Sequence, residues 1–259
     1  MEKKLSGAAI KWIAIITMLI DHIGAVILFP LLGRMTYGGY GPEEIELLNT
    51  IYTITRTIGR LAFPLFAFLI VEGFVHTRDI KKYGIRLFLF ALISEIPFDL
   101  ATQGVLLEGT GQNIYFTLTL GLVAMAVYEH FKEDNRFLGL AIALMISVLA
   151  EWAHVDYGFY GVLLMFVFYL YRKETGKMAI GFFILALYKF IEAIRQTGSM
   201  ELSSVPLFYY LMYFTPLLTL PILAQYNGVR GKQAKYFFYL FYPVHLLILY
   251  FIGKMILQG

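Results

Sequence analysis

Apolar blocks of about span length follow one another along the whole chain, and they limit its fold more than any other feature. The 259 residues are 59% hydrophobic, with a mean hydropathy of +0.70. A helix needs about 20 mostly apolar residues to cross the roughly 30 Å of bilayer hydrocarbon. Only helices and closed barrels satisfy the backbone there, and these blocks lack the alternation of barrel strands. We therefore predict an all-α, polytopic transmembrane helix bundle.

About nine spans are expected, in a single integral-membrane domain that covers residues 1–259. The connections between the blocks are too short to form a separate soluble domain. The first block is longer than a signal-peptide core and has no small-residue cleavage site, which favours a retained helix. The predicted spans are 8–32, 52–75, 82–101, 113–130, 136–152, 157–171, 177–195, 204–225 and 234–256.

Lysine and arginine gather at alternate junctions between these blocks. By the positive-inside rule this pattern predicts a cytoplasmic N-terminus and, with an odd number of spans, a C-terminus outside. A multi-pass protein of a bacterial plasma (inner) membrane is expected. The net charge of +3 is modest and spread over the junctions, so nucleic acid is not an expected partner.

The adjacent pair Asp21 and His22 lies near the middle of the first predicted span. Ionisable groups in a bilayer cost at least a few kcal/mol, which makes them functional candidates, with a structural ion pair as the alternative. Eleven steps of about 100° separate Lys11 from His22, so both lie on nearly one helix face. Histidine titrates near neutrality, and a neighbouring carboxylate can raise its basicity. A proton-transferring site at mid-membrane is the predicted result.

Other ionisable residues lie within or beside later spans, where they either serve function or neutralise one another. His245 falls at mid-depth beside Pro243, and we expect it either to face His22 or to bond a carbonyl. Pro64 is expected to kink the second span. Cysteine is absent, which excludes disulfides, thiolate metal sites and acyl-cysteine intermediates, and the five histidines lack metal-ligand spacing. No metal is expected.

Several sequence blocks together resemble the TraX family. They run in order over more than half of the chain and include Lys11-Trp12, Asp21-His22-Ile-Gly24, Gly59-Arg60-Leu-Ala-Phe-Pro64, Glu72-Gly73-Phe74 and Asp156-Tyr157-Gly158. The resemblance implies a transmembrane acetyltransferase that acts on the N-terminal amine of a pilin. It extends to acyltransferase-3 proteins, whose first helix carries arginine, ten residues and then an essential histidine, a spacing similar to Lys11 and His22 here.

This resemblance implies acetyl-CoA as the donor, an envelope peptide or glycan as the acceptor, and membrane lipids as surroundings. It implies that His22 is the general base, that Asp21 orients it, and that Arg60 stabilises the oxyanion. Cations at the cytoplasmic mouth would hold the CoA phosphates, namely Lys11, Arg78, Lys81, Lys82 and Arg86. The expected substrate-binding residues are Glu72, Glu95, Asp99, Asn113, Asp156, Tyr157 and His245.

Two other classes of protein use the same features. A proton-coupled transporter or flippase also needs buried titratable groups, although the sequence shows no inverted repeat. A structural subunit of an envelope assembly is the third alternative, and it would tolerate loss of His22. The sequence names neither the acceptor nor the oligomeric state.

Overall fold

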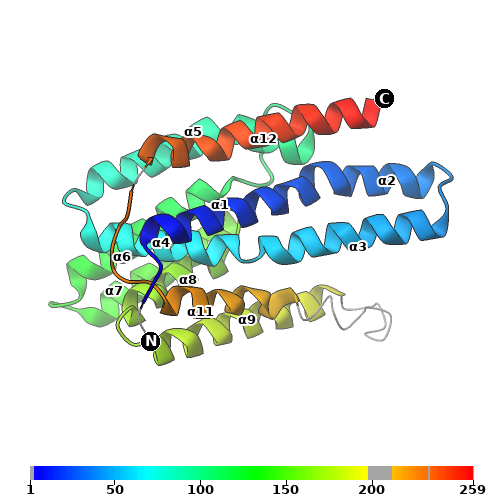
Figure 1. Ribbon diagram of the computed structural model, residues 1–259. Helices are drawn as coiled ribbons and strands as arrows, with labels where there is room; N and C mark the ends of the chain where they lie inside the picture. Colours follow the sequence, from blue (N-terminus) through cyan, green and yellow to red (C-terminus); the bar gives the residue numbers. More distant parts are fainter. Residues whose placement is uncertain (1–2, 198–211, 233, 259) are drawn as a thin grey trace.

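The protein is an all-helical bundle whose long axis most of its helices follow (Figure 1). The computed structural model describes residues 3–197, 212–232 and 234–258. Within those ranges the only extended pairings are two isolated bridges, Leu5 with Tyr226 and Gln112 with Val155. The two ends of the chain lie at opposite ends of the bundle (Figure 1).

Helices occupy the position of every predicted span, although part of the span 204–225 lies outside the described residues. Four stretches of the described chain are long and apolar enough to cross a membrane, namely Gly7–Tyr37, Pro42–His76, Ile114–Phe131 and Tyr236–Gln258. The number of crossings therefore stays a prediction. The elements are α1 (Gly7–Ile23), η1 (Gly24–Leu28), α2 (Phe29–Tyr37), α3 (Pro42–Gly59), α4 (Ala62–His76), α5 (Ile80–Gln103), α6 (Ile114–Phe131), α7 (Arg136–Trp152), α8 (Gly158–Tyr171), α9 (Thr175–Thr197), η3 (Met212–Leu218), α11 (Thr219–Ala224) and α12 (Lys235–Gln258).

The first two predicted spans are longer in the structure than in the sequence-based prediction. The first continues through the π-helical turn η1 to Tyr37, and the second begins at Pro42 rather than near residue 52. Glu43, Glu44 and Glu46 make the start of α3 polar, so a hydropathy criterion misses it. Pro42 at the start of the helix and the Glu44 carboxylate, which accepts from the Gly41 backbone N–H, nevertheless begin a helix there.

The second long helix is interrupted between α3 and α4, as predicted from Pro64. Pro64 lies in the first turn of α4, where its missing N–H leaves no intrahelical bond unmade. The interruption at Arg60 and Leu61 is thus one turn ahead of the proline. It places Arg60 at a helix terminus in the middle of the bundle.

Helices α4, α6 and α8 form the centre of the core, where small residues let them pack closely. Gly121 of α6 leaves room for Met165 of α8, and Gly161 of α8 lies against Thr117 and Phe63. Side chains such as Leu65 and Met125 are fully buried there. Close packing through small residues is typical of helices that associate in lipid, where burial of apolar surface supplies little drive.

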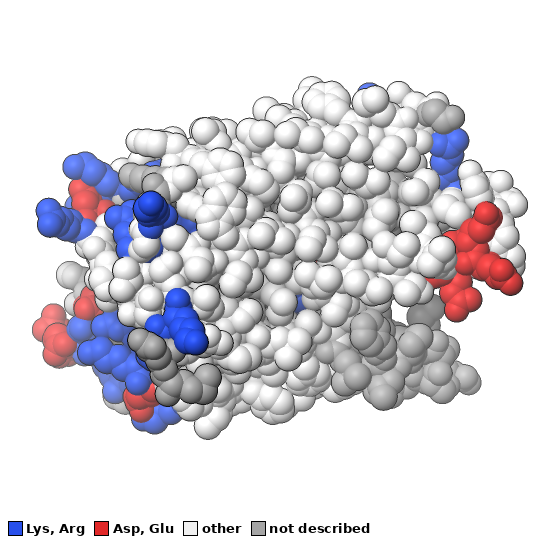
Figure 2. Space-filling view, in the orientation of Figure 1, with Lys and Arg blue, Asp and Glu red and all other residues white. Residues whose placement is uncertain are grey.

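On the face that Figure 2 shows, charged side chains gather at the two ends of the molecule and the broad band between them is almost entirely uncharged. Lysine and arginine gather at one end, on the turns before α5, α7, α9 and α12, for example at Lys81, Arg136 and Lys173. The opposite end carries Glu43 and Glu44 at the start of α3. We call the first of these the basic end. It is the end that the positive-inside rule assigns to the cytoplasm.

Candidate functional site

Asp21 of α1 forms an ion pair with Arg56 of α3 in the middle of the bundle. The Asp21 Oδ2 and Arg56 Nη1 atoms lie 2.8 Å apart, and the same guanidinium nitrogen donates to the Asp21 carbonyl at 3.4 Å. Gly59 makes this approach possible, because a Cβ at that position would overlap the Asp21 carboxylate. The structure thus gives Asp21 a partner other than the predicted one, His22.

His22 contacts His245 of α12 instead, which confirms that the two imidazoles face each other. The His22 Nδ1 and His245 Nε2 atoms lie 2.6 Å apart. His245 also donates from Nδ1 to the Phe241 carbonyl at 2.7 Å, so both expectations for this residue are met. Helix α1 and the last helix of the chain therefore meet at the proposed base.

Arg60 follows α3 and turns toward the connection between α7 and α8. Its guanidinium lies close enough to the side chains of Tyr157 and Asp21 to interact electrostatically with both. The Tyr157 ring stacks on Phe63, with ring centroids 4.0 Å apart. Residues that the sequence separates by about a hundred positions thus form one cluster with two arginines and two carboxylates, Asp21 and Asp156.

The connection between α7 and α8 is strained, and it carries Asp156 and Tyr157 into this cluster. His154 and Tyr157 have φ angles of 52° and 63°, a left-handed conformation that costs a non-glycine residue about 1–3 kcal/mol. Hydrogen bonds hold the segment: the Asp156 N–H donates to the Gln112 carbonyl at 2.8 Å, and the Thr117 hydroxyl donates to the Asp156 carbonyl. Strain kept in this way is a feature of functional sites.

Asp156 lies on that connection, where protein atoms crowd its carboxyl although the residue keeps an exposed surface. Loss of hydration raises its pKa to about 6, and the negative charge of Asp21 acts in the same direction, while Arg60 opposes both. The group is therefore mostly ionised near neutral pH and becomes neutral as the pH falls through about 6.

Several of these residues line a small cavity of about 90 Å³, which we call the inner cavity, whereas Arg56, Arg60 and His245 are not part of its lining. Its wall includes the candidate base and both carboxylates. The lining residues on which the later argument rests are Asp21, His22, Gly59, Asp156, Tyr157 and Tyr242.

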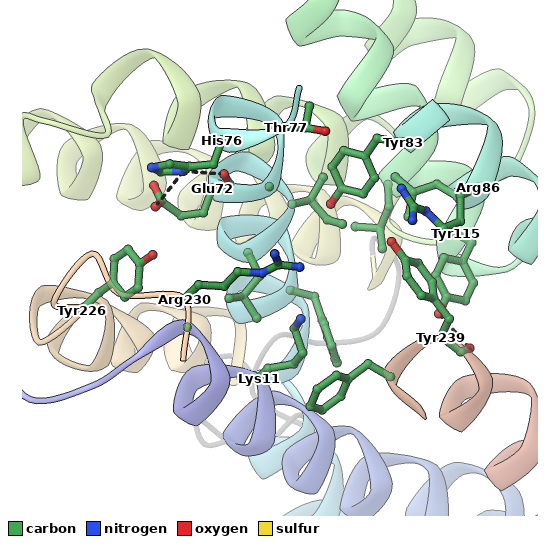
Figure 3. Close-up of a pocket in the computed structure, with 18 of the residues that line it drawn as sticks. Lys11, Glu72, His76, Thr77, Tyr83, Arg86, Tyr115, Tyr226, Arg230 and Tyr239 are labelled. Atoms are coloured by element: carbon green, nitrogen blue, oxygen red, sulfur yellow. Dashed lines mark hydrogen bonds and ion pairs between the residues drawn. The ribbon is translucent and has the colours of Figure 1, made fainter. Parts of the chain in front are cut away.

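A larger cavity of about 690 Å³ opens at the basic end, and we call it the basic cavity. Lys11, Arg78, Arg86 and Arg230 line it, and Figure 3 shows the Lys11 and Arg230 side chains pointing into one space with Arg86 across from them. The Nε atom of Arg86 is buried and has no hydrogen-bond partner in the described structure. Cations around an unmet donor suit a ligand that carries phosphate groups.

Three of the five cations predicted to bind the donor line this cavity, namely Lys11, Arg78 and Arg86. Lys81 and Lys82 do not, because they lie exposed in the first turn of α5, where Lys82 pairs with Asp79 at 3.2 Å. Sequence reasoning missed Arg230, which it read only as a topology signal in a loop. Glu72, a predicted substrate-binding residue, also lines the cavity and lies near the Tyr226 side chain.

Arg230 is fixed by backbone pairing between its loop and the start of the chain. The Gly7 N–H donates to the Val229 carbonyl at 2.8 Å, and the Ala8 N–H donates to the Arg230 carbonyl at 3.0 Å. Two N–H groups in the first turn of α1, which would otherwise lack helical partners, are satisfied in this way. In the same loop, burial and the neighbouring Glu72 carboxylate raise the pKa of Tyr226 to about 12.

The two cavities adjoin each other. Phe66, Tyr115, Leu118 and Phe238 line both of them. Lys11 lies with its Nζ atom 4.6 Å from the centre of the Phe238 ring, so the cation at the basic end reaches the same partition. A ligand held by phosphates in the basic cavity needs to pass only this apolar partition to reach His22.

Four predicted substrate-binding residues line neither cavity, namely His245, which contacts His22 as described above, and Glu95, Asp99 and Asn113. Asn113 caps α6, donates to the Ala91 carbonyl at 2.7 Å and donates to the Glu95 carboxylate. Asp99 accepts from the Glu108 N–H at 2.8 Å. These contacts fasten α5 to α6 and to the loop between them, which is a structural role.

Comparison with known proteins places the whole chain beside one family. The family described as "TraX protein" matches residues 6–253. The chain is 31% identical to "Probable fimbrial assembly protein FimC, serogroup H1" of Dichelobacter nodosus, over 98% of this chain and 97% of the other. It is 24% identical to an uncharacterised protein of Rickettsia prowazekii (strain Madrid E), over 84% of this chain and 79% of the other. No solved structure matches it.

Proposed function

Because this chain belongs to the TraX family, we propose that it is a membrane-embedded acetyltransferase that moves an acetyl group from cytosolic acetyl-CoA to an envelope acceptor. The observation that carries the proposal is the junction of the two cavities: a cation-lined cavity of about 690 Å³ shares a wall with a small one that contains a buried histidine. This junction supports a donor held by cations on one side of the shared wall and a base on the other side.

The donor would lie in the basic cavity, whose volume falls in the range of about 300–1,000 Å³ found for ligand pockets. Lys11, Arg78, Arg86 and Arg230 would hold its phosphates. The pantetheine arm would pass between Phe66, Tyr115 and Phe238 and present the thioester to the inner cavity. An inner cavity of about 90 Å³ has room for an acetyl group.

His22 would act as the general base in a direct transfer. It takes the proton from the acceptor amine or hydroxyl while the acceptor's lone pair attacks the thioester carbon. Arg60 stabilises the oxygen that becomes negative, and the Asp21–Arg56 pair holds the neighbouring backbone in place. The carbon–sulfur bond then breaks, and the proton on His22 passes to the thiolate sulfur, so CoA leaves as a thiol.

The name of the Dichelobacter relative points to an acceptor connected with fimbriae. The N-terminal amine of a pilin-like peptide reaching the inner cavity from the non-basic end fits this name, and an envelope glycan is the alternative acceptor. The apolar band between the charged ends supports a place in the plasma membrane. Lipid would cover exposed apolar side chains such as Ile184, Ile248 and Phe251.

The test is consumption of acetyl-CoA by purified protein in detergent with a pilin-derived peptide, followed by mass spectrometry of the peptide. We expect an increment of one acetyl group and its loss in His22→Ala, with the variant still folded. His130→Ala, at an exposed histidine near the basic end, is the matched control. Full turnover by His22→Ala would contradict the assigned base.

A proton-coupled transporter is the alternative, and the partly buried cluster of Asp21, Arg56 and Arg60 with the neighbouring Asp156 is the observation in its favour. Protein reconstituted in vesicles separates the two functions. Movement of a solute driven by a proton gradient, without release of CoA, would replace the transferase proposal.

A further inference from the structure

We infer that His245 is a positioning residue that holds His22 in the tautomer whose Nε2 atom is the base. The inference rests on the transferase reaction proposed above. It assigns His245 a role other than the predicted binding of substrate. The case is made by three hydrogen-bonding groups in a row: the Phe241 carbonyl, His245 and His22.

The hydrogen bond to Phe241 determines which nitrogen of His245 carries the proton. Its Nδ1 atom lies 2.7 Å from the Phe241 carbonyl oxygen, one helical turn earlier in α12. A carbonyl oxygen only accepts hydrogen bonds, so Nδ1 of His245 carries the hydrogen. In a neutral imidazole the other nitrogen, Nε2, is then an acceptor.

The contact with His245 in turn determines which nitrogen of His22 carries the proton. Its Nδ1 atom lies 2.6 Å from the His245 Nε2 acceptor, so His22 donates from Nδ1. The lone pair of neutral His22 therefore belongs to Nε2, the nitrogen that is not engaged by His245. Since His22 lines the inner cavity, Nε2 is the nitrogen available to a reacting group there.

Packing keeps both rings in this arrangement. The His245 ring lies between Phe241, with centroids 4.7 Å apart in a stacked contact, and Tyr242, with centroids 5.8 Å apart at an edge. His245 is only 5% exposed. Tyr242 also meets the edge of His22, with centroids 5.9 Å apart. A ring flip in either histidine would put a C–H group in place of a hydrogen-bonding nitrogen and break a hydrogen bond.

During transfer, the proton that leaves the acceptor forms a bond with Nε2 of His22. The resulting imidazolium keeps donating from Nδ1 to His245, so the second ring shares its charge. When the thiolate leaves, the proton returns from Nε2 to sulfur and both rings are neutral again. A second imidazole thus does the work that a carboxylate does in a Ser-His-Asp triad, without adding a permanent charge at mid-membrane.

Steady-state kinetics of two variants test the inference. We expect His245→Leu to lower kcat about 100-fold or more, because His22 loses its acceptor and can adopt the unproductive tautomer, while the KM for acetyl-CoA stays within about twofold. His245→Gln should recover about tenfold over leucine, since an amide oxygen accepts from Nδ1 but takes no proton. His130→Gln is the matched control and should behave as wild type.

Wild-type kcat in His245→Leu would overturn the inference while leaving the transferase intact. A loss that appears only in the KM for the acceptor would also overturn it, because that result assigns His245 to substrate binding. Absence of acetyl transfer by the wild-type protein would instead overturn the proposed function.

Nitrogen-15 NMR of histidine-labelled protein identifies the tautomer of each histidine directly. The experiment needs no turnover, so it can be done even if the acceptor is unknown. The chain has five histidines, and His22→Gln assigns the signal of His22 by its loss. The expected result is a neutral His22 protonated at Nδ1 in the wild type, with a shift toward the Nε2–H form in His245→Leu. An Nε2–H form in the wild type would sink the inference even if kcat falls in the variants.

Discussion

At the scale of single residues, Gly59 of α3 allows α1 to come close enough for Asp21 to pair with Arg56. A Cβ there would overlap the carboxylate of Asp21, and Asp21 belongs to the same cavity wall as His22. We expect Gly59→Ala to push the carboxylate from Arg56 and to lower acetyl transfer about 10- to 100-fold, since misplacement of about 1 Å can cost a factor of this size. The rate of CoA release by the purified variant measures it.

Gly33→Ala is the matched control for this substitution. Gly33 lies in α2, where no atom approaches within 4 Å of the added methyl group. Both changes remove a helical glycine, so both gain the same intrinsic helix propensity of up to about 1 kcal/mol. An equal activity in the two variants would show that the position of Asp21 does not matter for transfer.

The depth of single residues was predictable, but their partners were not. Hydropathy alone places Asp21 and His22 at mid-span, because apolar runs of similar length flank the pair on both sides. The contacts of these residues lie 35 positions away at Arg56 and 223 positions away at His245. Helix phase constrains the face of one helix, and only the packing of several helices decides which faces meet.

At the scale of the element, Tyr115 compensates for a hydrogen bond that Pro243 removes from α12. Proline has no N–H, so the Tyr239 carbonyl four residues earlier lacks its helical donor. The Tyr115 hydroxyl of α6 donates to that carbonyl at 3.1 Å. The proline that frees a carbonyl in α12 thereby ties α12 to α6 beside the partition between the cavities.

A double-mutant cycle tests this compensation. Tyr115→Phe should lower the free energy of unfolding by about 1 kcal/mol in the wild type, because a buried carbonyl loses its donor. In a Pro243→Ala background the residue-243 N–H supplies the bond, so the same change should cost little. Thermal unfolding in detergent measures the four proteins. Equal losses in both backgrounds would refute the coupling.

Element ends that depend on local chemistry were predictable, and those that depend on charge were not. Several helices begin where a side chain caps the first turn, as Ser6, Asn113 and Asn135 do, close to the limits read from hydropathy. The start of α3 was not predicted, because three glutamates lower the hydropathy there, although Pro42 signals a helix start. The place of Arg230 in the cavity lining was not predicted either. The sequence of its loop shows charged residues and glycines, but it does not show that the loop borders a cavity.

At the scale of the whole molecule, the separation of charge predicts which end faces the cytoplasm. The chain has no cysteine, so a single introduced thiol reports its own position. We expect a membrane-impermeant maleimide to label Glu44→Cys in intact spheroplasts and Lys173→Cys only after the membrane is opened. Both side chains are exposed at opposite ends of the bundle. The reverse pattern would invert the topology and place the basic cavity outside.

The pairing of Leu5 with Tyr226, and of His22 with His245, also bears on how this protein is made. A ribosome delivers Arg230 and His245 more than 200 residues after the first helix begins, when that helix is expected to lie in the bilayer already. Until then the early helices hold His22 without its partner His245, and the basic cavity lacks Arg230. If the proposed transfer holds, the growing polypeptide should therefore stay inert toward cytosolic thioesters until the segment with His245 has joined the bundle.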